Sequence, residues 1–335
     1  MPFTFEPFIE VSGVFFQASL VSVILLLQFI LGVALPGQSH RPPFVWWFAG
    51  RMGQILKGKL DRPGRGERSL FIRGILALVF MTMVAWGLAT LGRAAALTLP
   101  YGWCVIVILV WGSINLTVPW RLLRGLAAVP DLNKLPQNTA ALSDLTNMDF
   151  SKADAHTIAR GALMYTAWAL CRYMVAPVMA YILFGSMGLM IYVFAFSPVC
   201  DIDFGARPRQ RFLRPFYLVQ SIFDFIPARI TAAVIYIAAI LTPTAHPAYC
   251  LNVVFDGAQK FPGVNFGTVL KAFSGAVNVS LGGGVLYRDG LRLVYPWFGP
   301  AEASAKADVT DIKRGFGIHI YSFALVFLGV LICLI

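Results

Sequence analysis

The sequence predicts an all-α polytopic membrane protein with about four to six membrane helices, a central helical hairpin or re-entrant region, and cytoplasmic loops. Of its 335 residues, 58% are hydrophobic and only 13% are charged, and the mean hydropathy is +0.72. Soluble domains carry roughly 25% charged residues, so the composition excludes an ordinary soluble domain. The net charge of +11 is typical of basic loops beside membrane spans. We therefore expect one integral membrane domain over residues 1–335, with the lipid bilayer as a partner and no nucleic acid.

The region that predicts the central hairpin is residues 156–200. It is apolar throughout, yet it contains Arg160 and Arg172, and charged side chains at membrane depth are costly and mark functional positions. Pro177 and two later glycines interrupt it, as in helices that line a cavity. Basic segments on both sides indicate that it enters and leaves on the cytoplasmic side, and Asp154 is placed to cap its first helix. The alternative is two packed helices whose arginines reach the headgroups.

Three spans are expected before this hairpin, each of a length that suits about 30 Å of hydrocarbon. They cover residues 12–35, 70–91 and 101–118. The basic residues of Gln54–Arg73 place that loop in the cytoplasm. Phe44–Leu60 carries aromatic and aliphatic residues beside basic ones, which predicts a helix lying in the membrane interface; the alternative is an ordinary loop.

A broken helix is predicted over residues 216–241, because Asp224, Pro227 and Arg229 stand where a plain span has none. The two charged residues are five positions apart, so they do not stack on a regular helix. A kink at the proline either brings them together or releases each to a different partner.

The C-terminal part is expected to be a long loop, residues 242–313, followed by a span over 315–335. Gly282, Gly283 and Gly284 allow close approach of the backbone to a ligand, or form a flexible turn. The pattern of a phosphate-binding P-loop is absent.

Five sequence motifs, in order along nearly the whole chain, resemble the adenosylcobinamide-phosphate synthase family of cobalamin biosynthesis (CobD/CbiB). AmpE-like proteins are more distant relatives of the same scaffold. The motifs are Arg41–Arg62, Met174–Val178 (MVAPV), Ile226–Ala232 (IPARITA), Gly275–Gly283 (GAVNVSLGG) and Asp311–Arg314 (DIKR).

This resemblance implies a synthase that joins an aminopropanol unit, or its phosphate, to the carboxylate of adenosylcobyric acid. It also implies a helix resembling E-x-x-x-E-N-x-x-D, whose three acidic positions and one asparagine position here are Met164, Trp168, Arg172 and Ala169. Positions 164, 168 and 172 share one helix face. Because a thioether, an indole and a cation cannot bind a metal ion as carboxylates do, we expect a catalytically degenerate member that acts as a subunit, scaffold or sensor. The alternative is an active enzyme with a rearranged site.

No catalytic residue and no metal ligand are assigned, and the five cysteines and four histidines lack the spacing of a metal site. A corrinoid, ATP and magnesium are expected only if the family activity persists. The guanidinium of Arg172 should face the interior and pair with Asp224 or Asp201. The expected location is the bacterial inner membrane, with a membrane-protein partner or a second copy; a transporter is disfavoured because no internal repeat is present. The cavity or ligand candidates are Met164, Trp168, Arg172, Asp201, Asp203, Asp224, Arg229, Asn265, Gly282, Gly283 and Gly284.

Overall fold

The structure is a computed structural model that describes residues 13–34, 43–62, 64–115, 117–128, 136–199, 211–255 and 263–334. Within these residues four helices are long and apolar enough to cross a membrane, or five if the bent pair α10–α11 counts as one span. The predicted class, an α-helical multi-pass membrane protein, is therefore confirmed. The elements are α2 (Val14–Ala34), α3 (Phe44–Leu60), α4 (Glu67–Thr98), α5 (Trp103–Trp111), α6 (Thr117–Ala127), α7 (Pro136–Thr146), α8 (Ala155–Ala169), η2 (Leu170–Val175), α9 (Ala176–Phe196), η3 (Ser197–Val199), α10 (Arg214–Phe223), α11 (Phe225–Leu241), α12 (Pro247–Phe255), α13 (Val264–Val277), β1 (Leu281–Leu286), β2 (Arg292–Phe298) and α14 (Val309–Ile332).

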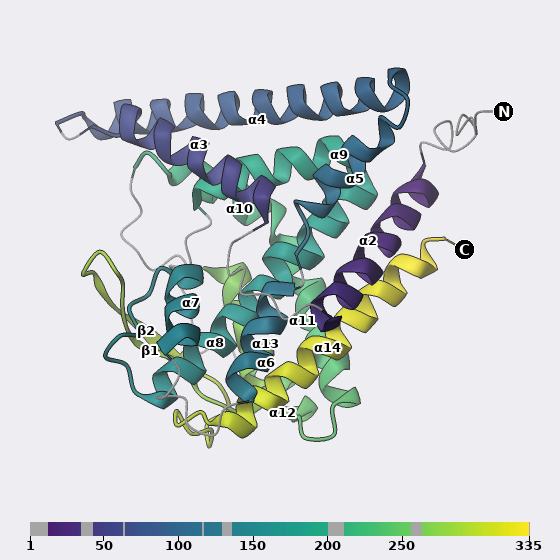
Figure 1. Ribbon diagram of the computed structural model, residues 1–335. Helices are drawn as coiled ribbons and strands as arrows, with labels where there is room; N and C mark the ends of the chain where they lie inside the picture. Colours follow the sequence, from purple (N-terminus) through teal and green to yellow (C-terminus); the bar gives the residue numbers. More distant parts are fainter. Residues whose placement is uncertain are drawn as a thin grey trace.

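The outer helices present large apolar side chains that no described part of the chain covers. On α4, Leu76, Met83 and Leu91 are each more than 60% exposed, as expected for surfaces that face lipid. In Figure 1, α2 and α14 run side by side, while α4 crosses the top of the molecule above α9. Helix α4 continues to Thr98 instead of ending at residue 91, because the alanines that follow are strong helix formers.

The centre of the molecule is the stretch α8–η2–α9, in which residues 161–178 are all buried. Twenty residues of straight helix would span about 30 Å, yet Arg172 Nη1 lies 3.1 Å from Tyr192 Oη. The chain reverses at Gly185, whose φ of 65° and ψ of −160° break the helix. The predicted central hairpin is thus confirmed, and a residue without a Cβ is used where φ is positive.

A second break lies between α5 and α6, and it corrects the span expected over 101–118. Helix α5 stops after nine residues at Trp111 and α6 starts at Thr117, because the intervening glycine, serine and asparagine are weak helix formers. Pro177 has no N–H to offer the carbonyl of Tyr173, four residues earlier. The backbone N–H of Asn115 donates to that carbonyl instead, at 2.9 Å.

Neighbouring helices satisfy the backbone of the α5–α6 link, which is how irregular backbone is tolerated inside membrane proteins. The Gly112 carbonyl accepts from the N–H of Val45, and the Ser113 carbonyl accepts from the indole of Trp46. The side chain of Gln28, on α2, donates to the carbonyl of Ile114. Residues 44–60 are a helix, as predicted, and not a loop; its position in the membrane interface remains a prediction.

The predicted break in residues 216–241 is present, although it lies at Asp224 and not at Pro227. Helices α10 and α11 meet there at 53°. Pro227 cannot donate to the carbonyl of Phe223, and its ring excludes that carbonyl from a regular helix. The proline is therefore favourable in the first turn of α11, and it prevents α10 from continuing as a regular helix.

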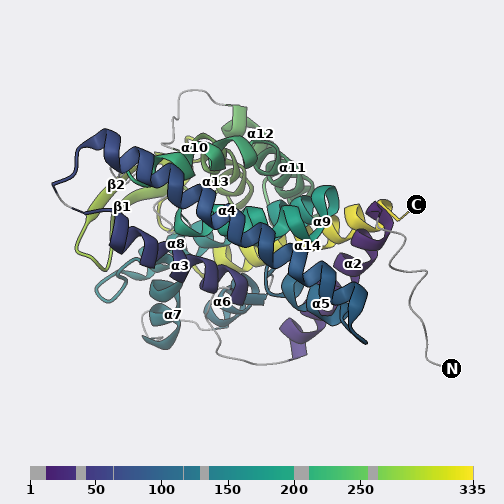
Figure 2. The ribbon, with the colours of Figure 1, turned by 90° about the horizontal axis from the view of Figure 1, so that it is seen from above.

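The prediction of a long loop over residues 242–313 is wrong, because this region contains α12, α13 and the β1–β2 hairpin. Apolar residues of α13 recur at Phe266, Val269, Phe273 and Ala276, a helical period that the glycines obscured. Gly275 indicates close packing, since a Cβ there would lie 2.6 Å from the carbonyl oxygen of residue 249 on α12. Seen from above (Figure 2), α10 to α13 lie on one side of α4 and α9, and α3, α5, α6 and α7 lie on the other.

Candidate functional site

A charged pair is buried between the two arms of the hairpin and the α10–α11 break. The Nη1 atom of Arg172 is 3.2 Å from Oδ2 of Asp224, and the two side chains are 1% and 4% exposed. The hydroxyl of Tyr192 donates to Oδ1 of the same carboxylate at 2.9 Å, and the amide of Gln220 donates to Oδ2 at 3.2 Å. Both carboxylate oxygens are thus occupied by protein donors.

Local breaks in the helices position this pair. Arg172 lies in the π-helical turn η2, a rare conformation that is frequent at functional sites, and Asp224 lies where α10 ends. Aromatic rings surround the guanidinium, with the centroids of Trp168, Phe196 and Phe266 at 5.9, 5.9 and 5.4 Å. The prediction that Arg172 faces the interior and pairs with an acid is confirmed for Asp224. The other named acids, Asp201 and Asp203, lie outside the described residues.

Arg229 and Asn265 come together on the exposed side of the same break. The Arg229 guanidinium donates to the carbonyl of Phe225 at 2.7 Å and to Oδ1 of Asn265 at 3.4 Å. The Asn265 amide donates to the carbonyl of Ser221. Asp224 and Arg229 therefore take different partners, which was one of the two predicted outcomes.

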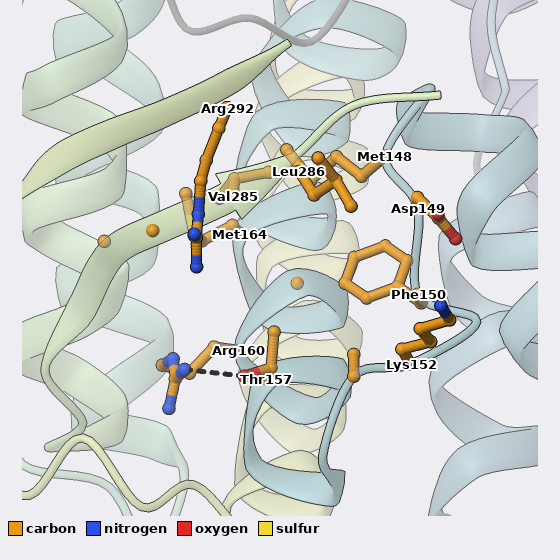
Figure 3. A pocket seen from close by; sticks show the side chains of 14 residues that line it. Met148, Asp149, Phe150, Lys152, Thr157, Arg160, Met164, Val285, Leu286 and Arg292 are labelled. Atoms are coloured by element: carbon orange, nitrogen blue, oxygen red, sulfur yellow. Dashed lines mark hydrogen bonds between the residues drawn. The ribbon is translucent and has the colours of Figure 1, made fainter. Parts of the chain in front are cut away.

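A cavity of about 210 Å³ lies between the first half of α8 and the β1–β2 hairpin (Figure 3). Its lining includes three cationic side chains, those of Lys152, Arg160 and Arg292, and one carboxylate, that of Asp149. A hydrogen bond from Ser151 holds the pKa of Asp149 below its usual range, so this carboxylate is ionised at neutral pH. The remaining lining residues are Met148, Phe150, Ala153, Thr157, Gly161, Met164, Gly282, Gly284, Val285 and Leu286.

The start of α8 fixes one wall of the cavity. The carboxylate of Asp154 accepts from the backbone N–H of Thr157 at 2.8 Å, which confirms the predicted helix cap and lowers the pKa of Asp154. Arg160 donates to the hydroxyl of Thr157 at 2.9 Å and to the carbonyl of Ala305, and its guanidinium lies 5.4 Å from the ring of Trp297.

The glycines of the hairpin form the opposite wall. Gly282 and Gly283 belong to β1, with φ of 114° and 83° at an irregularity in the β1–β2 register, so the expectation of a flexible turn is wrong. A Cβ on Gly282 would lie 2.4 Å from the carbonyl oxygen of Pro296. Gly284 differs, because a Cβ there would meet no atom within 4 Å.

One face of the central helix joins the cavity to the buried pair. Met164 lines the cavity, Trp168 stacks on Phe266 at 6.1 Å, and Arg172 reaches Asp224. Among the described residues, no three His, Cys, Asp or Glu side chains gather as they would around a metal ion. Arg160 was singled out from the sequence as a charge in an apolar stretch, although it was not listed among the cavity candidates. Tyr192, Gln220, Lys152 and Arg292 were not predicted, and the charges on Lys152 and Arg292 were the only sequence signal for them.

The chain resembles proteins of cobalamin biosynthesis. The family model described as CobD/Cbib protein matches residues 23–318. A protein of Stutzerimonas stutzeri (strain A1501) named "Cobalamin biosynthesis protein CobD" is 26% identical over 271 residues, which cover 80% of this chain and 83% of that protein. No solved structure matches.

Proposed function

Because this chain belongs to the CobD/CbiB family of cobalamin biosynthesis, we propose that it is a catalytically degenerate member. It acts as a membrane-embedded subunit, scaffold or sensor in the bacterial inner membrane. Its partner in that role is another membrane protein or a second copy of the chain.

The observation that carries the proposal is the buried pair of Arg172 and Asp224. By sequence resemblance, the family has an acidic residue at the position of Arg172. A guanidinium there reverses the sign of the local charge, and a divalent ion prefers carboxylate and other oxygen ligands. Met164 and Trp168, on the same helix face, supply no oxygen.

The acidic residue that remains in this cluster, Asp224, already has hydrogen-bond donors on both carboxylate oxygens. Asp224 accepts from Tyr192 on one oxygen and from Gln220 and Arg172 on the other. To bind a metal ion, the carboxylate would have to leave a buried cation without its partner, which is a strongly unfavourable change. The cluster is therefore better suited to holding two broken helices together than to acid–base or metal chemistry.

Complementation tests this proposal. A bacterial strain that lacks its synthase receives this chain, with the deleted synthase as the positive control and membrane expression confirmed for both. We expect no corrinoid-dependent growth from this chain. Restored growth would refute the degenerate assignment and favour an active enzyme with a rearranged site that includes Asp201, Asp203 and Asp224.

A further inference from the structure

We infer that the cavity between α8 and the β1–β2 hairpin binds a small organic oxyanion. Its charge is the first argument. The charged lining residues are three cations, Lys152, Arg160 and Arg292, and one carboxylate, that of Asp149. A concave site lined by an excess of one charge concentrates ligands of the opposite charge.

Arg292 supplies the strongest positional argument. In Figure 3 its side chain descends from β2 into the space between β1 and α8. Its guanidinium makes no ion pair or hydrogen bond with any residue that the structure describes. Arg160, by contrast, is fixed by Thr157 and Trp297. The cavity thus combines one preorganised cation with one that is available to a ligand.

The walls limit the size and chemistry of the ligand. At about 210 Å³, the cavity is smaller than the roughly 300–1,000 Å³ of pockets that hold drug-sized ligands, so it is too small to enclose a corrinoid. Phe150 and Leu286 provide an apolar wall beside the cations. The ligand class is therefore a compact anion, with two or more negative charges and a short carbon body.

Binding is tested with the full-length protein in nanodiscs of zwitterionic lipid at constant ionic strength. The probes are pyrophosphate, orthophosphate and malonate, and calorimetry measures the dissociation constants. We expect saturable binding; a preference for the phosphates would identify a phosphoryl ligand, and a preference for malonate would identify a dicarboxylate. Absence of saturation with all three would overturn the inference.

Two variants locate the binding. Hydrogen bonds to charged groups are the strong ones, so Arg292→Gln should weaken binding about 10- to 100-fold. The matched control is Arg288→Gln, on the same hairpin but outside the cavity, where the arginine pairs with Asp144; it should change binding less than about twofold. Equal loss in both variants would mean general attraction to a basic hairpin, and would overturn the inference.

A third variant closes the cavity without removing a charge. Because a Cβ at Gly284 would meet no atom within 4 Å, Gly284→Leu should preserve the fold while its side chain fills the cavity and abolishes binding. Unchanged binding by a folded Gly284→Leu protein would contradict the site. The inference rests on the proposed function only for the biological role of the bound anion, since a sensor needs a ligand. Failure to bind would overturn the site alone, and restored synthase activity would overturn the degenerate assignment alone.

Discussion

Replacing Arg172 by methionine should destabilise the protein far more than the loss of one exposed charge would. The substitution leaves Asp224, whose side chain is 4% exposed, as a buried carboxylate without its cation. Breaking such a pair from one side costs about 3–5 kcal/mol of unfolding free energy. The hydrogen bonds from Tyr192 and Gln220 remain, so we expect about 3 kcal/mol.

The reverse change, Asp224→Leu, leaves the buried guanidinium of Arg172 without its carboxylate and should lower the unfolding free energy by a similar amount. In the double variant no charge is stranded, and buried ion pairs replaced by apolar groups are often close to neutral. The double variant should therefore cost no more than either single change, a departure from additivity of at least about 3 kcal/mol.

Unfolding of the purified protein in mixed micelles, followed by tryptophan fluorescence and far-UV circular dichroism, measures these free energies. The matched control is Arg229→Met, an exposed arginine on α11, which should change stability by less than about 0.5 kcal/mol. Additive effects of the two buried substitutions, or single losses below about 1 kcal/mol, would refute the assignment of a buried, mutually dependent pair.

Three further predictions concern topology, the hairpin turn and the helix cap. Cysteines introduced into Gln54–Arg73 or Arg207–Arg214 should resist an impermeant reagent applied to intact cells, because both segments are rich in positive charge and should lie in the cytoplasm; labelling from outside would contradict this. Gly185→Ala should cost about 1–2 kcal/mol in the same unfolding assay, since φ there is 65° and a Cβ would crowd α2. Asp154→Ala should cost about 1 kcal/mol at neutral pH by removing the cap on Thr157. Because the folded pKa of Asp154 is lowered, that contribution is present above the ordinary pKa of about 3.9 and is lost as the pH falls through the folded pKa; an equal effect of the substitution in strong acid would contradict the cap.

The features that sequence alone determined are those set by local composition. Hydropathy and charge determined the membrane class, the central hairpin over 156–200 and the helix over Phe44–Leu60. The cap at Asp154 also depends on neighbouring residues only. Arg172 was singled out because an apolar segment cannot leave a charge unpaired, so its burial with an acid followed from solvation energy before any geometry was known.

Only the tertiary structure decided the features that join distant parts of the chain. The break in the span expected over 101–118 is matched to a distant part of the chain, because Asn115 supplies the hydrogen bond that Pro177 withholds from Tyr173, and no local pattern relates these positions. The glycines of 242–313 resembled loop residues, whereas the structure uses Gly275 for close helix packing and Gly282 for the irregular strand. Glycine permits a turn, a close contact or a positive φ equally well, so the residue type alone does not distinguish them. The cavity likewise exists only because β2 carries Arg292 to the helix that holds Arg160, more than a hundred residues earlier in the chain.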